Sequence, residues 1–316
     1  MPMNKPPEPF PAALCNVLSR RAALRLFSLP AGFAACALSA PAVWSQTPTP
    51  PRLPRIVSVN GAMTEIAYAL GAGPQLAGTD TTSVFPEAAL HTPKVGYMRQ
   101  LSAEGLLSLK PDTVIGTTEA GPGVVMDQLR SAGMNVALVE ADHTWAEVQR
   151  KVAAVGQATA CRAEASALQA RLDAEWDGVQ ATVARRAGRK PRAIFILSHA
   201  ATPQVAGRQT AADAMLNYAG FVNAFTQGAS SAFAGYRPMT AEALVSAAPE
   251  VIVTTTQGIE ASGGLEKFWS RPGLALTPAY RQRALVALDA LYLIGFGPRL
   301  PQAVAELHRF SLKVAA

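Results

Sequence analysis

One segment of the chain recurs, and the recurrence limits what the chain can fold into. Residues 99–118 and 237–256 align at a constant offset of 138, with eight identities over the twenty positions. The identical pairs are Arg99/Arg237, Ala103/Ala241, Glu104/Glu242, Leu106/Leu244, Ser108/Ser246, Pro111/Pro249, Thr117/Thr255 and Thr118/Thr256. Gly-Tyr introduces each copy, as Gly96-Tyr97 and Gly235-Tyr236, with one residue fewer before the second arginine. A single repeat at this spacing is not a solenoid, whose units recur every ~20–50 residues, and it predicts two similar lobes.

The segments around each copy alternate between apolar strands and helices. In the first half we expect strands at 55–59, 75–80, 113–116 and 135–139, and helices at 64–70, from 102 or 103, and at 124–132. In the second half we expect strands at 193–197, 251–254 and 285–288, helices at 211–219, from 240 and at 301–314, and a loop at 198–210. Nearly continuous apolar strands separated by helices are typical of parallel sheets covered on both faces.

A long stretch between the two halves has no strand pattern. Its apolar residues recur at three- and four-residue steps, which predicts amphipathic helix with Gly156 as the candidate position for a break. The expected fold class is therefore α/β, with two similar lobes, mainly parallel central sheets and one long backbone helix. We place the N-terminal lobe at 54–143, the helical linker with the long helix at 144–190, and the C-terminal lobe at 191–316.

The first 45 residues are typical of an export signal. Arg20-Arg21 precede a moderately apolar run at 26–42, a pattern that indicates the twin-arginine route. The run is shorter than the ~20 residues that a membrane-spanning helix needs. Cys36 follows an imperfect lipoprotein box, so a lipid anchor is an alternative. A Pro-rich linker follows at 46–53, and we expect a soluble, monomeric mature protein in the periplasm.

Charge and motif content exclude several function classes. Of the net charge of +6, half lies in residues 1–45, so the remainder carries no nucleic-acid footprint. The chain has no Gly-x-Ser-x-Gly, no His-Glu-x-x-His and no phosphate-binding loop, which predicts that it is not an enzyme. An exported hydrolase stays a remote alternative. The four histidines lack a close metal-ligand spacing, and His91, His143 and His308 are expected at the surface.

Four motifs in this lobe–helix–lobe order carry a family resemblance. They are residues 95–102 (VGYMRQLS), 207–213 (GRQTAAD), 235–238 (GYRP) and 291–299 (LYLIGFGPR). With them, residues 54–312 resemble the periplasmic substrate-binding proteins of ABC importers for vitamin B12, iron–siderophores and haem, and most resemble the haem branch. The resemblance implies a protein that captures hemin, which is ferric haem b, in an interlobe cleft and delivers it to a membrane permease. A ferric siderophore or cobalamin is the alternative ligand.

The resemblance makes Tyr97 the expected haem-iron ligand. A phenolate is a hard anionic donor suited to ferric iron, and tyrosine is a known axial haem ligand. Because phenol ionises near pH 10, the iron and a neighbouring cation must favour the anion. Arg99, Arg237 and Tyr236 are the expected partners of the phenolate or of the haem propionates. His199, by its placement after a strand of the second lobe, resembles a second iron ligand found in some relatives.

The glutamates of the repeat are the expected contacts with the permease. In the resembled family, one surface glutamate on each lobe docks to arginines of the permease, and Glu104 and Glu242 match that placement. The alternative is that each glutamate only stabilises the first turn of its helix, by ~0.3–1 kcal/mol. Glu65 is a weaker candidate for the same docking role.

Overall fold

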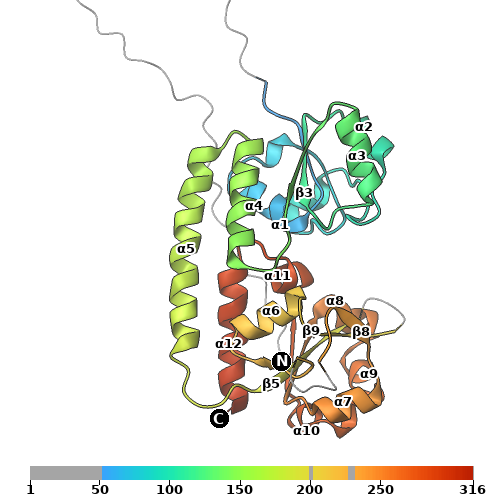
Figure 1. The fold of residues 1–316 in the computed structure, drawn as a ribbon, viewed down its shortest axis with the longest axis vertical. Coiled ribbons are helices and arrows are strands. Elements are labelled where there is room, and N and C mark those ends of the chain that lie inside the picture. The colour runs from blue at the N-terminus through green and yellow to red at the C-terminus, as the bar shows by residue number, and fades with distance from the viewer. Residues whose placement is uncertain (1–51, 199–201, 227–231, 316) are drawn as a thin grey trace, which may run out of the picture.

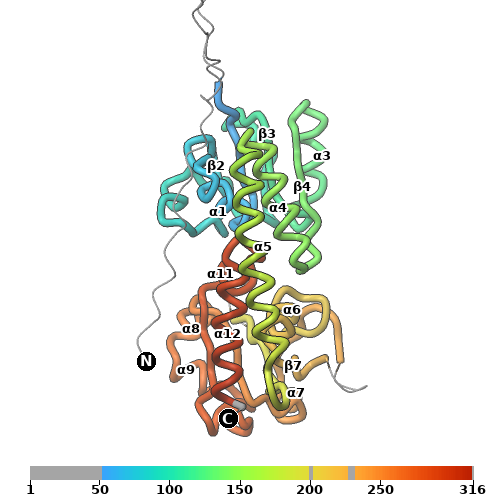
Figure 2. The backbone as a smooth tube through the Cα atoms, turned by 90° about the vertical axis from the view of Figure 1, so that its left-hand side faces the viewer, coloured from blue at the N-terminus to red at the C-terminus, as the bar shows by residue number. Residues whose placement is uncertain are grey.

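The computed structural model describes residues 52–198, 202–226 and 232–315. They form two α/β lobes, and helix α5 (Arg162–Ala184) runs along both of them, with α12 (Leu300–Ala315) beside it in the second lobe (Figures 1 and 2). The predicted fold class is thereby confirmed. The export signal, Cys36, most of the Pro-rich linker and His199 lie outside the described residues.

The first lobe is built on a parallel sheet. Its strand order is β2-β1-β3-β4, and every pairing is parallel. The strands are β1 (Ile56–Ser58), β2 (Leu76–Thr79), β3 (Thr113–Thr117) and β4 (Asn135–Val139). The helices are α1 (Gly61–Ala69), α2 (Ala103–Ser108) and α3 (Gly123–Ser131), with short 3₁₀ turns at Gly73–Gln75 and Glu87–His91.

The second lobe repeats this order and adds an antiparallel edge. The parallel strands β7-β5-β9-β10 correspond to β2-β1-β3-β4, while β6 and β8 extend the sheet from β5. The strands are β5 (Arg192–Leu197), β6 (Gln204–Ala206), β7 (Val222–Asn223), β8 (Tyr236–Pro238), β9 (Val251–Thr255) and β10 (Leu285–Leu288). The expected loop at 198–210 was therefore wrong in part, because β6 lies within it.

Helices cover this second sheet as they cover the first. Their bounds are α6 (Ala211–Tyr218), α7 (Ala241–Ala247), α8 (Thr256–Ala261), α9 (Leu265–Trp269), α10 (Pro278–Gln282), α11 (Ala290–Ile294) and the 3₁₀ turn Leu274–Leu276. The sequence predicted α6, α7 and α12 but not the short helices α8 to α11. Helices of five or six residues hold too few turns to show a clear period.

The repeat performs the same structural task in both lobes. Asp112 accepts a hydrogen bond from the backbone N–H of Arg55 (2.7 Å), and Glu250 accepts one from that of Arg192 (2.9 Å). Each arginine in turn donates to a carbonyl oxygen at the end of the repeat helix, at 2.9 Å in the first lobe and 2.8 Å in the second. These bonds attach α2 and α7 to the first strand of their own lobe.

The helical linker consists of two helices rather than one helix with a break at Gly156. Helix α4 (Trp145–Ala158) continues through Gly156 without a break, and it packs against α5 (Figure 1). A Cβ atom at Gly156 would lie 2.3 Å from the Cβ of Ala165, so the glycine allows the two helices to approach closely. The chain turns at residues 159–161 instead.

Buried charged side chains connect the two lobes. Arg299, which precedes α12, contacts Glu65 of α1 at 2.6 and 3.0 Å. Lys151 of α4 pairs with Glu147 at 2.6 Å and donates to the carbonyl oxygens of residues 295 and 296 at 3.1 and 3.0 Å. Because Glu65 is only 3% exposed, the weaker suggestion that it docks to a permease was wrong.

One histidine expected at the surface is buried. His308 of α12 is 3% exposed, and its Nδ1 lies 3.0 Å from the carbonyl oxygen of Ala219. His91 is exposed as expected, whereas His143 is partly buried against the ring of Phe296, with ring centroids 5.5 Å apart. The error at His308 arose because the buried face of α12 accommodates a polar ring that has a carbonyl partner.

Candidate ligand-binding site

Tyr97 lies on a tight loop at the carboxyl end of β2. The N–H of Thr81 donates to the carbonyl oxygen of Gly96 at 3.0 Å, and the N–H of Gln100 donates to that of Tyr97 at 2.8 Å. Gly96 has a φ of +101°, a conformation that strains any residue with a side chain. The loop leaves Tyr97 39% exposed at the sheet edge where open α/β folds bind ligands.

Arg99 joins Tyr97 to a carboxylate. Its Nη1 donates to Tyr97 Oη at 2.9 Å, and its Nη2 forms an ion pair with Glu119. Burial alone would lower the pKa of Arg99, but Glu119 and Tyr97 outweigh it and raise that pKa. Arg99 is therefore a fixed cation beside the phenol oxygen. The sequence reasoning missed Glu119, although it directly follows the repeated Thr117-Thr118 pair.

Tyr236 of β8 faces this group from the second lobe. Desolvation raises the pKa of Tyr236 to about 12, Glu119 adds to the increase, and Arg99 and a hydrogen bond with Thr210 partly oppose it. Because both groups affect this pKa, the Tyr236 hydroxyl lies within electrostatic reach of the Arg99–Glu119 ion pair, which belongs to the first lobe. At neutral pH Tyr236 is a neutral phenol that can donate a hydrogen bond.

Arg237 is not part of the same cluster. Neighbouring residues of a strand point to opposite faces, so Arg237 projects away from Tyr236. Its guanidinium stacks on the ring of Phe233, 4.7 Å from the centroid. Within residues 52–198, 202–226 and 232–315, no carboxylate lies within 4.0 Å of it. It is an exposed cation without a counter-ion in the described part of the chain.

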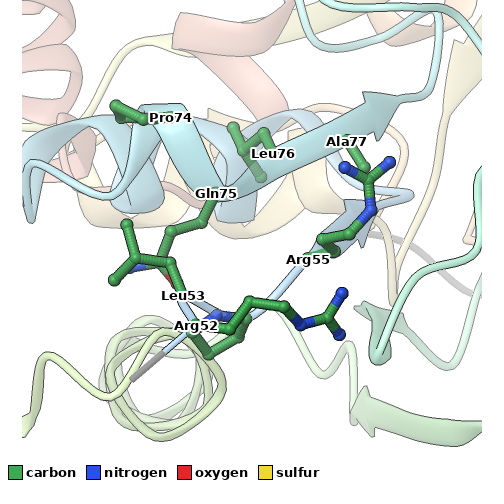
Figure 3. Close-up of a pocket in the computed structure, with 8 residues that line it drawn as sticks. Arg52, Leu53, Arg55, Pro74, Gln75, Leu76 and Ala77 are labelled. Atoms are coloured by element: carbon green, nitrogen blue, oxygen red, sulfur yellow. The ribbon is translucent and has the colours of Figure 1, made fainter. Parts of the chain in front are cut away.

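Two cavities lie away from Tyr97. One, of about 420 Å³, opens at the amino ends of β1 and β2, where Arg52, Arg55 and Gln75 line it (Figure 3). The other, of about 570 Å³, lies between α4 and α5. Ligands of open α/β sheets collect at the carboxyl ends of the strands, so neither cavity belongs to the candidate site.

Glu104 and Glu242 occupy matching exposed positions. Each lies in the first turn of its helix, α2 or α7. Both helices lie away from α5 in Figure 1. Ser102 and Thr240 cap these helices by accepting backbone N–H bonds of 3.2 and 3.1 Å. In the described residues neither glutamate forms an ion pair, so both carboxylates are available to an outside partner.

Metal-binding clusters and membrane-spanning helices are both absent from the described ranges. There, no group of three or more His, Cys, Asp or Glu side chains is arranged to hold a metal ion. Within the same ranges, no helix has both the length and the apolar character to cross a membrane.

Comparisons with known proteins agree on one family. The heme-binding protein BhuT, solved with two hemes, is 44% identical, with a TM-score of 0.77 over 83% of this chain and 99% of that one. The apo heme-binding protein RhuT from Roseiflexus sp. RS-1 is 39% identical, with a TM-score of 0.78 over 84% and 100%. The substrate-binding lipoprotein YvrC of Bacillus subtilis, an uncharacterized ABC transporter component, is 29% identical over 80% of this chain and 78% of its own. The family model for periplasmic binding proteins matches residues 56–292, and the chain therefore belongs to the periplasmic binding protein family.

Proposed function

We propose that this protein binds haem between its two lobes, outside the cytoplasm, and delivers it to the permease of an ABC importer. It is a binding protein rather than an enzyme. BhuT and RhuT, which resemble nearly the whole described chain, are both heme-binding proteins. The observation that carries the proposal is the exposed Tyr97, whose hydroxyl oxygen accepts a hydrogen bond from Arg99 at the ligand-binding edge of the sheet.

Tyr97 is the iron ligand in this proposal. Ferric iron favours a hard anionic donor, and phenolate is one of the axial ligands that haem proteins use. Arg99 stabilises the phenolate through a charge-assisted hydrogen bond. Tyr236, which stays neutral, offers a hydrogen bond from the opposite lobe. His199 stays a proposal for a second iron ligand.

The propionates of haem need a separate cation. Arg99 is occupied by Glu119, whereas Arg237 is exposed and has no carboxylate partner in the described residues. A guanidinium suits a carboxylate geometrically, so we assign Arg237 rather than Arg99 to a propionate.

Glu104 and Glu242 are the proposed permease contacts. Their equivalent positions in two similar lobes suit a partner that presents two similar basic surfaces. Export through the twin-arginine route, with a lipid anchor at Cys36 as the alternative, is the proposed path out of the cytoplasm.

Hemin titration tests the binding function. The purified protein should bind hemin with a Soret absorption band, and Tyr97→Phe should weaken that binding strongly because the iron loses its anionic ligand. Tyr68→Phe is the matched control, since Tyr68 lies in the same lobe and its hydroxyl contacts Thr92 at 3.2 Å, outside the candidate site. Equal hemin affinity in Tyr97→Phe and the parent would contradict the site assignment.

A competition experiment separates the alternative ligands. Excess cobalamin or a ferric siderophore should fail to displace hemin. Displacement at comparable concentrations would mean that cobalamin or a ferric siderophore is the preferred ligand. Neither of these compounds needs a phenolate donor from the protein.

A further inference from the structure

Glu119 contacts the arginine that donates to Tyr97, which connects this carboxylate to the proposed iron ligand. It lies two residues after the end of β3, at the carboxyl edge of the first sheet. Its carboxylate pairs with Nη2 of Arg99, while Nη1 of the same guanidinium donates to Tyr97 Oη at 2.9 Å. Arg99 therefore bridges a carboxylate and a phenol oxygen, with one nitrogen for each.

The bridge overcomes a cost in conformational entropy. Holding a long arginine side chain in one position costs conformational entropy, because a free arginine samples many rotamers. The hydrogen bond to Tyr97 Oη is a single contact at the end of that side chain, so a second contact on the same guanidinium restricts its orientation further. The Arg99 side chain is half exposed, so packing alone does not fix it. Glu119 adds a second, charged anchor from the end of a buried strand.

We propose that Glu119 is a positioning residue of the haem site, which holds the Arg99 guanidinium against Tyr97 Oη and keeps it from binding a carboxylate of the ligand. This inference rests on the proposed function, because it takes Tyr97 as the iron ligand. The same role for Glu119 also determines where the haem propionates bind. The propionates are left to other donors, of which the exposed Arg237 is the candidate.

The second copy of the repeat shows what happens without this carboxylate. Glu119 corresponds at the repeat offset to Gln257, whose Nε2 donates to Asp289 at 2.7 Å. A neutral amide so engaged cannot anchor an arginine, and Arg237 instead stacks on Phe233. Among the described residues, Glu119 also interacts electrostatically with Tyr236 of β8 and Lys151 of α4. Lys151 is held by Glu147 and by the carbonyl oxygens of residues 295 and 296, so it does not replace Arg99 as the partner of Tyr97.

The iron–oxygen stretching frequency of the hemin complex, measured by resonance Raman spectroscopy, tests the proposal. A hydrogen bond to the phenolate withdraws electron density from the oxygen and weakens its bond to iron. Arg99→Leu should therefore raise the frequency. Glu119→Gln should raise it in the same direction, and the double variant should lie no higher than Arg99→Leu. Glu140→Gln, an exposed carboxylate after the neighbouring strand β4, should keep the parent frequency.

The direction of the shift separates positioning from a pure charge effect. If Glu119 acted only through its charge, its removal would leave the hydrogen bond and make the phenolate a weaker donor, which would lower the frequency. An unchanged or lowered frequency in Glu119→Gln, with a raised one in Arg99→Leu, would overturn the proposal and leave the proposed function intact. A phenolate band that is missing from the parent complex or survives Tyr97→Phe would overturn the iron-ligand assignment, and the role of Glu119 with it.

Discussion

The two copies of the repeat place the same arginine in different surroundings. Arg99 is held between Tyr97 and Glu119, on a loop at the carboxyl end of the first sheet. Arg237 lies on an antiparallel edge strand, where it stacks on Phe233. The later parts of the copies are alike, because Asp112 and Glu250 make equivalent hydrogen bonds to the first strand of each lobe. The later part of the repeat, from the helix to Asp112 or Glu250, is thus structurally the same in both lobes. The earlier part, around Arg99 or Arg237, differs between the lobes, as expected of a ligand-specific site.

The largest expected effect concerns the half that the lobes share. Reversing both charges, as Glu104→Arg with Glu242→Arg, should abolish haem uptake by cells, because like charges would face the basic surfaces of the permease. Hemin binding by the purified protein should not change. Glu87→Arg with Glu266→Arg, two first-turn glutamates outside the repeat, is the matched control for added charge. Uptake that survives the Glu104 and Glu242 reversals would remove the docking assignment.

The next effect should separate the two arginines. Arg99→Leu should weaken hemin binding about tenfold to a hundredfold, since a hydrogen bond to a charged group is worth ~1.5–3 kcal/mol. Arg237→Leu should weaken it about fivefold or less, because an exposed ion pair contributes at most ~1 kcal/mol. Fluorescence-quenching titrations measure both affinities. Equal losses of affinity would mean that Arg99 and Arg237 have equivalent roles toward the ligand, which would contradict the difference between their surroundings.

Tyr236 gives the second lobe its own dependence on pH. Burial raises its pKa to about 12, above the unfolded value near 10, so the folded state keeps its proton longer. The associated stability is complete below pH ~10 and is lost as the pH rises toward 12, by on the order of 2 kcal/mol. Urea unfolding of the parent and Tyr236→Phe across this range measures the difference. If both lose the same stability, the burial assigned to the Tyr236 hydroxyl is wrong.

The smallest effect should be the same in both lobes. Asp112→Asn and Glu250→Gln each weaken an acceptor for the N–H of the first strand, which should cost ~1 kcal/mol of unfolding free energy. Denaturant midpoints at constant slope measure the two losses. A loss confined to one lobe would show that the shared half of the repeat is not structurally equivalent.

Local signals predicted most of the fold. Apolar β-branched strands and the capping residues Ser102 and Thr240 mark most of the parallel strands and both repeat helices. The strands β6, β7 and β8 were missed as strands because each has only two or three residues. A strand this short is specified by its partner rather than by its own pattern.

Long-range contacts account for the other errors. Gly156 reads as a helix break in sequence, but its role depends on Ala165 of the next helix. Glu65 reads as a surface glutamate, but it pairs with Arg299, 234 residues later. Of the site, the sequence predicted Tyr97, Arg99 and Tyr236 through the resemblance. It did not predict Glu119, because no local pattern marks a carboxylate whose arginine partner lies twenty residues earlier in the chain.

The choice between the two tyrosines tests the central claim most directly. The absorption and resonance Raman spectra of the hemin complexes of Tyr97→Phe and Tyr236→Phe should be recorded side by side. We predict that Tyr97→Phe loses the iron–phenolate bands and that Tyr236→Phe keeps them, because the Tyr97 oxygen is exposed beside the Arg99 cation while burial keeps Tyr236 neutral. Loss of the bands in Tyr236→Phe, with their retention in Tyr97→Phe, would contradict the account.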